Sequence, residues 1–163
     1  MEKLEAIPAP QNYEKYMRHC LDLATIALQN GNPPVGAILV FEDKIIGKGI
    51  ESGKSTGDIT NHAEILAIRD VLQNGYSDLL NHAKMFTTHE PCIMCSYAIR
   101  HHKIPHIIYG VSVDYVGGFT SEFNILSTEK VPKWGPNPLV TTGVCETECH
   151  LLNEQFLRSL MKN

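Results

Sequence analysis

The sequence predicts an α/β fold: a three-layer sandwich in which a five-stranded mixed sheet lies between helices. Three observations lead to this prediction. The chain opens with an amphipathic helical pattern, and two short strand patterns joined by a tight turn follow it. Helical and strand patterns then alternate through the rest of the sequence. This order is typical of a sheet that helices cover on both faces.

The length and composition indicate a folded globular protein. With 163 residues, of which 43% are hydrophobic, the chain 1–163 is most simply one domain that buries roughly two-thirds of its unfolded surface. Residues 1–11 contain Pro8 and Pro10, and we expect them to form an irregular N-terminal arm. The start lacks a signal-peptide run, and no stretch approaches the roughly 18 apolar residues of a membrane span. We therefore expect a cytoplasmic protein that does not cross a membrane.

The first half of the chain predicts a helix, a hairpin and a second helix. Apolar side chains recur with a helical period over residues 12–30. Two apolar runs, 37–41 and 44–49, flank Glu42-Asp43 and predict a β-hairpin. Residues 51–60 are rich in Gly, Ser, Thr and Asp and are expected to form a loop. The second helix then runs to Asn74-Gly75, a typical helix stop.

The second half predicts strands, helices and one long crossing. Residues 79–82 are ambiguous, residues 114–119 are expected to form a loop, and prolines at 132, 136 and 138 mark an irregular crossing. The predicted elements are a strand at 85–88, a helix at 92–102, a strand at 104–111, a short helix at 121–130, a strand at 140–142 and a final helix at 144–161.

Two short motifs carry the candidate chemistry. They are His62-Ala63-Glu64 and Pro91-Cys92-Ile93-Met94-Cys95. One imidazole and two thiolates are a ligand set that zinc prefers, and a catalytic zinc site leaves its fourth position to water. Glu64 lies close enough in sequence to serve that water without being a ligand. His62, Cys92 and Cys95 are therefore the predicted metal ligands, and Glu64 is the predicted catalytic residue.

These motifs, in this order and with Pro91 directly before Cys92, resemble the cytidine-deaminase-like superfamily. From about Tyr13 to Leu160 the chain is similar to the branch that contains tRNA adenosine, guanine and cytosine deaminases. Residues 32–37 also look like that branch's first pocket loop and the start of its first strand. The resemblance implies parallel pairing of the fourth and fifth strands, one Zn²⁺ per chain, and a homodimer whose partner helps to wall the pocket.

The reaction that this resemblance implies is hydrolytic deamination, in which oxygen replaces an exocyclic amine on a ring carbon. Zinc lowers the pKa of water to about 7. Cys92 and Cys95 lie at a predicted helix start, where the helix dipole favours thiolate. Glu64 would take a proton from the water, protonate the ring nitrogen and then deliver a proton to the departing ammonia.

Two alternatives concern the cysteines. A closed structural zinc site would need a fourth protein ligand and would leave Glu64 without a task. Cys145, Cys149 and His150 have a spacing that suggests a second metal site. Free cysteine is more often a small buried hydrophobic residue of a helix, and we favour that interpretation for this pair.

Seven further residues are candidates for substrate contact: Pro34, Val35, Glu51, Asn61, His89, Asp114 and Phe123. Asn61, or Thr60 beside it, also suits the N-cap of the second helix. His89 is equally consistent with an ordinary exposed loop histidine. Phe123 would stack on a flat ring or pack in the core. Asp114 lies one position from an acidic residue that several members of the resembled branch use at the pocket rim.

Glu51 departs from the resembled branch, which places a ring-binding Asn there. An ionised carboxylate only accepts hydrogen bonds, whereas an amide both donates and accepts. Glu51 therefore favours a substrate that presents N–H groups at this point. The alternative is a shifted loop in which Glu51 is solvated.

The sequence favours a hydrolase, an aminohydrolase of a free nucleobase, nucleoside or related amino-heterocycle such as a purine. A net charge of −4, from 14 Lys and Arg against 18 Asp and Glu, argues against a generally nucleic-acid-binding surface. A tRNA-specific adenosine-to-inosine deaminase is the alternative, with tRNA as partner. A second alternative, from another class, is a zinc-containing binding protein without catalytic activity.

Overall fold

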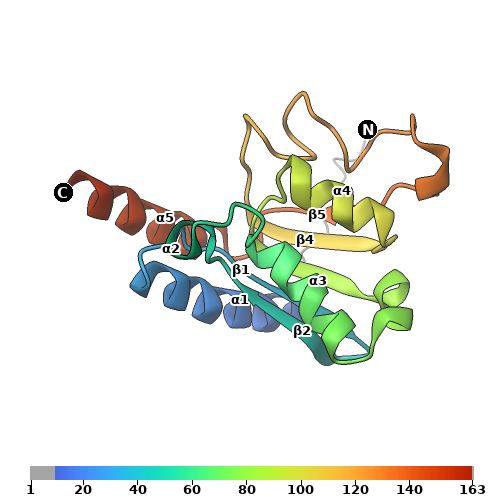
Figure 1. The fold of residues 1–163 in the computed structure, drawn as a ribbon, viewed down its shortest axis with the longest axis horizontal. Coiled ribbons are helices and arrows are strands. Elements are labelled where there is room, and N and C mark those ends of the chain that lie inside the picture. The colour runs from blue at the N-terminus through green and yellow to red at the C-terminus, as the bar shows by residue number, and fades with distance from the viewer. Residues whose placement is uncertain (1–9, 163) are drawn as a thin grey trace, which may run out of the picture.

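The computed structural model describes residues 10–162, and its centre is one five-stranded sheet (Figure 1). Residues 1–9 of the predicted arm lie outside the described residues, whereas Gln11 already belongs to the first helix. The strands are β1 (Gly36–Phe41), β2 (Lys44–Ile50), β3 (Lys84–His89), β4 (His106–Val111) and β5 (Leu139–Thr141). The main helices are α1 (Gln11–Gln29), α3 (Ala63–Gln73), α4 (Ile93–His101) and α5 (Glu146–Met161).

The sheet is mixed, as the sequence predicts. Its strand order is β2-β1-β3-β4-β5. β1 pairs antiparallel with both β2 and β3, whereas β3–β4 and β4–β5 are parallel pairs. The expected parallel pairing of the fourth and fifth strands is therefore confirmed. The predicted hairpin is also confirmed, and Glu42 (φ 46°) and Asp43 (φ 62°) both take the left-handed conformation that suits a tight two-residue turn.

Alternating side chains of the strands build two separate cores, one on each face of the sheet. On one face, Leu39, Met85 and Ile107 pack with buried residues of α3 and α4. On the other face, the neighbouring residues in the same strands pack against α1. Successive strand residues point to opposite faces, so apolar residues at adjacent positions bury both. The three-layer sandwich is confirmed.

Helix α3 lies directly on β2, and this close packing fixes the start of the helix. A Cβ atom at Gly49 would overlap the carbonyl oxygen of Ala63 and the amide of Ala67. Glycine is therefore required where the strand and the helix backbone meet. Because His62 is the N-cap residue of α3, this contact also places its backbone.

Several local predictions need correction or completion. The expected loop 51–60 contains a one-turn helix, α2 (Gly53–Thr56), and the ambiguous segment 79–82 belongs to a 3-10 helix, η1 (Ser77–His82). The expected helix at 121–130 is absent, because this segment is held in turns by a buried side chain. The Arg100 guanidinium donates hydrogen bonds to the carbonyls of Ile125 and Thr128.

The connection between β4 and β5 is thus almost without regular structure. Between residues 112 and 138 it contains only the 3-10 helix η2 (Pro132–Trp134). The last helix begins at Glu146, not at 144, because Cys145 takes a left-handed conformation (φ 54°). Within residues 10–162, no helix has both the length and the apolar character needed to cross a bilayer.

Candidate metal centre and active site

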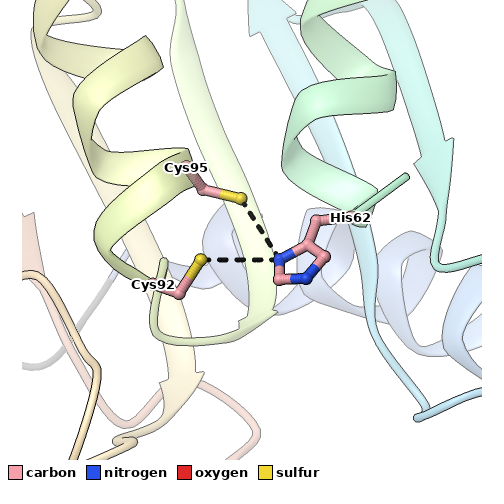
Figure 2. A group of neighbouring side chains, drawn as sticks. All are labelled: His62, Cys92 and Cys95. Carbon is pink, nitrogen blue, oxygen red and sulfur yellow. Dashed lines mark hydrogen bonds between the residues drawn. The ribbon is translucent and has the colours of Figure 1, made fainter. Parts of the chain in front are cut away.

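Three side chains predicted as metal ligands meet where α3 and α4 begin (Figure 2). His62 is the N-cap residue of α3, Cys92 is the N-cap residue of α4, and Cys95 lies in the first turn of α4. The Nδ1 atom of His62 lies 3.5 Å from Sγ of Cys92 and 3.6 Å from Sγ of Cys95. The ligand atoms of the three residues all lie within 4.8 Å of one another.

This donor set fits zinc. One imidazole nitrogen and two thiolate sulfurs are ligands that zinc prefers, and three protein ligands leave one tetrahedral position open. In the part of the chain that the structure describes, these three residues are the one cluster of His, Cys, Asp and Glu close enough to hold an ion. Cys145, Cys149 and His150 form no such cluster there, and Cys149 is buried at 1% exposure, as the apolar interpretation expects.

Without a metal, hydrogen bonds within the cluster shift the pKa values of its two thiols and its imidazole. A hydrogen bond from Cys95 lowers the pKa of Cys92 to about 4 and, together with burial, raises the pKa of Cys95 well above its usual value. The hydrogen bond with Cys92 raises the pKa of His62 to about 9. Because zinc binds thiolates and neutral imidazole, metal binding would expel the remaining protons from this cluster.

Glu64 lies beside the cluster on the first turn of α3 and is only 3% exposed. Its Oε1 accepts a hydrogen bond of 2.8 Å from the Thr87 hydroxyl of β3, and its Oε2 accepts one of 3.4 Å from the Cys95 thiol. Burial raises the pKa of Glu64 to about 7. A carboxyl group with a pKa near the working pH both takes and gives protons readily.

A cavity of about 200 Å³ opens beside Glu64 and the ligand cluster. This volume is below the roughly 300–1,000 Å³ of pockets for drug-sized ligands and suits a single flat ring. Its walls are Pro33, Val35, Glu51, His62, Glu64, His89, Glu90, Cys92, Val113, Tyr115 and Val116.

The seven predicted contact residues divide into two groups. Val35, Glu51 and His89 line the cavity. Pro34, Asn61, Asp114 and Phe123 are not among its lining residues. The Asn61 amide instead bonds to Thr56 and Arg69, and Phe123 is 44% exposed, so it belongs to neither the cavity wall nor the core.

Glu51 is buried at 6% exposure, so the solvated alternative is wrong. Its two oxygens accept hydrogen bonds from backbone amides, Oε1 from Gly53 at 3.4 Å and Oε2 from Ala63 at 3.2 Å. Glu51 therefore accepts a hydrogen bond from an amide at the start of α3, whereas the sequence predicts Thr60 or Asn61 as the capping residue. Burial raises the pKa of Glu51.

His89 ends β3 and is a strand residue, so the exposed-loop alternative is wrong. Burial lowers the pKa of His89 to about 4, which keeps its ring neutral at pH 7. Its Nε2 atom is buried and has no hydrogen-bond partner among the described residues. The role of His89 in substrate binding stays a prediction.

Several residues of this region are not identified from the sequence. Thr87 orients Glu64, and Glu90, Val113, Tyr115 and Val116 line the cavity, where Tyr115 has 78% of its surface exposed. The hydroxyl groups of Thr87 and Thr88 at the end of the predicted strand are the available signal, but the sequence does not indicate which of them meets Glu64. Glu90 and Tyr115 follow no periodic pattern, so only the fold brings them to the site.

Comparison with known proteins agrees with this geometry. Residues 10–111 match the family described as the cytidine and deoxycytidylate deaminase zinc-binding region. A tRNA-specific adenosine deaminase of Streptococcus pyogenes serotype M1 is 32% identical over 143 residues, which cover 88% of this chain and 82% of that protein. The tRNA-specific adenosine deaminase 2 of Danio rerio is 33% identical over 134 residues, which cover 78% of this chain and 62% of that protein.

A solved structure described under A-to-I editing by tRNA:A34 deaminases at the wobble position of transfer RNA has the same fold. It superposes with a TM-score of 0.77 at 29% identity, over 85% of this chain and 98% of that one. The predicted zinc cofactor and the predicted enzyme class, a hydrolase of C–N bonds, are confirmed by the family match. The chain therefore belongs to the zinc-dependent cytidine and deoxycytidylate deaminase family.

Proposed function

We propose that this protein deaminates adenosine to inosine in tRNA. The observation that carries the proposal is the likeness to tRNA-specific adenosine deaminases over most of the chain, at 32% identity across 143 residues for the Streptococcus protein. It supports the tRNA alternative over the free small molecule that the sequence analysis favours. The net charge of −4 remains a property of the whole chain, and RNA contacts need only a local surface.

In this proposal Glu64 moves the protons. His62, Cys92 and Cys95 would hold the zinc, which would supply a water nucleophile of lowered pKa. Glu64 would take the first proton of the attacking water and pass it to the ring nitrogen, and would then take the proton of the added hydroxyl group and pass it to the amine, which leaves as ammonia. The hydrogen bond from Thr87 to Oε1 leaves Oε2 beside Cys95 and thus beside the metal cluster. Thr87 therefore aims the carboxylate at the reacting atoms.

The mouth of the cavity suits a nucleotide that is part of a longer strand. Tyr115 lines the cavity yet is 78% exposed, so its ring offers a surface at the entrance. Stacking of a base on an aromatic ring contributes roughly 1–3 kcal/mol to binding. We propose that Tyr115 stacks on a base that flanks the inserted adenine, a contact that a free base cannot make.

Glu51 favours a second candidate function, deamination of a free amino-heterocycle. Each carboxylate oxygen of Glu51 accepts one backbone amide and keeps a second lone pair for a ligand. An ionised Glu51 thus suits a ring with N–H groups at this wall, whereas a ring nitrogen without hydrogen would find no donor there.

Homodimer formation also stays a prediction, which analytical ultracentrifugation would test.

A substrate panel at two salt concentrations separates the two functions. The substrates are an anticodon stem-loop with a wobble adenosine, the same stem-loop with guanosine there, and free adenine, adenosine, guanine and cytosine. We expect inosine, measured by mass spectrometry, from the first stem-loop alone, with turnover that weakens as salt rises because phosphate contacts release counterions. Salt-independent ammonia release from a free heterocycle, with no inosine in the stem-loop, would contradict the proposal and support the second candidate.

A further inference from the structure

Glu90 is a buried carboxylate that lies between the end of β3 and the metal ligand Cys92. It is 3% exposed. Its Oε1 accepts hydrogen bonds from the amide of Val113 at 2.9 Å and from the Thr120 hydroxyl. Its Oε2 accepts hydrogen bonds from the amides of Phe119 at 2.8 Å and Thr120 at 2.7 Å. One side chain therefore joins two places in the chain that are six residues apart.

These four bonds close residues 113–120 into an arch, the name used here for that segment. The arch contains no helix and no strand of the sheet. Its first half supplies Val113, Tyr115 and Val116 to the cavity wall. Its second half touches the metal-binding segment, since the amide of Gly118 donates to the carbonyl of Pro91 at 2.8 Å and Gly117 forms an isolated bridge with Cys92.

The charge of Glu90 is satisfied by these donors. Within residues 10–162, Glu90 makes no ion pair with a cationic side chain. Converging amide N–H groups and a hydroxyl stabilise a buried anion, and each such charge-assisted bond is stronger than a neutral one. The arch packs closely around the carboxylate, because a Cβ atom at Gly117 would overlap both oxygens of Glu90.

We propose that Glu90 is a positioning residue for the deaminase reaction and that it holds the arch in place as a wall of the substrate cavity. Glu90 does so through Val113, Tyr115 and Val116 and has no part in proton transfer. The proposal concerns substrate binding by this family's site and does not depend on whether the substrate is RNA. Loss of the carboxylate should therefore weaken substrate binding and leave the metal and the chemical step in place.

The test compares Glu90→Gln with the matched control Glu122→Gln, which changes an exposed glutamate just beyond the arch. Gln keeps the shape but turns an NH₂ group toward amide donors. With the adenosine stem-loop as substrate, we expect KM of Glu90→Gln to rise about tenfold, kcat to stay within threefold, and zinc to stay at one per chain. Glu122→Gln should match the wild type in all three.

Hydrogen exchange gives a readout that needs no substrate. The amides of Val113, Phe119 and Thr120 should exchange at least tenfold faster in Glu90→Gln, while amides of the central strands keep their protection. A wild-type protein that is inactive on the stem-loop would count against the proposed function only, and the exchange result would still decide this one.

Two further variants cover the case in which Glu90→Gln does not fold. Gly117→Ala keeps the carboxylate but displaces the arch, so it should reproduce the rise in KM, and Thr120→Val removes one of the four bonds and should raise KM about threefold. Unchanged KM and unchanged exchange in these variants would overturn the proposal. Loss of zinc with a parallel fall in kcat would also overturn it, because Glu90 would then support the metal ligands.

Discussion

The metal cluster and the arch face the same cavity but are built in different ways. Cys92 and Cys95 lie three residues apart at the start of α4, and the packing of the fold brings His62, which comes 30 residues before Cys92, to them at the start of α3. The arch is part of a long irregular crossing and keeps its shape through a buried carboxylate that lies 23–30 residues earlier in the chain. Both regions depend on tertiary contacts, but the residues of the metal cluster stand in short motifs that the sequence displays, whereas the contacts of the arch with Glu90 follow no motif.

The largest expected effect comes from breaking the metal cluster. Cys92→Ser and Cys95→Ser should each lose both zinc and turnover, because a serine oxygen is a far poorer zinc ligand than a thiolate. Metal analysis of the purified variants measures the first loss and an ammonia-release assay the second. The double variant Cys145→Ala/Cys149→Ala is the control and should keep one zinc per chain. Full zinc retention in both serine variants would refute the ligand assignment.

The next effect separates the proton carrier from the metal ligands. Glu64→Gln should keep one zinc per chain but lower kcat by at least 10²–10⁴-fold, because Gln preserves the shape and cannot carry a proton. Thr87→Val should lower kcat less, by about tenfold, since it only releases the orientation of Glu64. Single-turnover kinetics measures both. A rate for Glu64→Gln within tenfold of the wild type would assign proton transfer to another residue.

A substitution in the cavity wall should change the preference of the enzyme among substrates. Glu51→Asn replaces an acceptor with a group that also donates, so the ratio of kcat/KM between adenosine and a ring with N–H groups should change by about 5–150-fold, or roughly 1–3 kcal/mol. The same substrate panel measures this ratio. Because Glu51 also accepts the amide of Ala63, the melting temperature of the variant serves as the control. An equal change for every substrate would place Glu51 outside substrate recognition.

The smallest effect concerns a site away from the cavity, on the sheet. Burial, with a smaller contribution from Lys84, lowers the pKa of His106 to about 4, below its usual value of 6.5. Between pH 6.5 and 4 the unfolded chain therefore binds a proton that the folded protein does not, so stability falls as pH falls through this window. In His106→Gln the loss of unfolding free energy on acidification should be smaller by about 1–2 kcal/mol. This value allows for solvent screening of a half-buried group.

Urea unfolding at pH 7 and pH 5 measures the His106 effect. At pH 7 the histidine is mostly neutral in both states, so a difference between variant and wild type mainly reflects its hydrogen bonds to Thr141 and Tyr13. If the free energy of unfolding of His106→Gln falls between pH 7 and pH 5 as much as that of the wild type, other groups are responsible for the acid sensitivity.

Much of the fold follows from the sequence because side-chain alternation has a direct physical cause. Adjacent apolar residues such as Ile38 and Leu39 fill the two cores, and turn residues such as Glu42 and Asp43 take conformations that end strands. The segment 121–130 is predicted as a short helix but forms turns, in which the distant Arg100 donates hydrogen bonds to the carbonyls of Ile125 and Thr128. Local propensity is a weak guide where a buried side chain satisfies the backbone.

The candidate site shows the same division. The ligand cluster and Glu64 are predictable, since residue type and spacing state the chemistry. Glu51 is identifiable only as a departure from similar proteins, and its contact with Ala63 needs the structure. Glu90 is beyond sequence reasoning, because a single carboxylate beside a strand carries no sign of the four donors that converge on it.

The most direct test of the division between chemistry and selection is to measure Glu64→Gln and Glu90→Gln side by side. Zinc content, substrate dissociation constant and single-turnover rate are determined for both with the adenosine stem-loop. The account predicts that Glu64→Gln loses rate by at least 100-fold with the dissociation constant nearly unchanged, and that Glu90→Gln weakens binding about tenfold with its rate at saturation nearly unchanged. Both variants losing the same quantity, rate or binding, would contradict it.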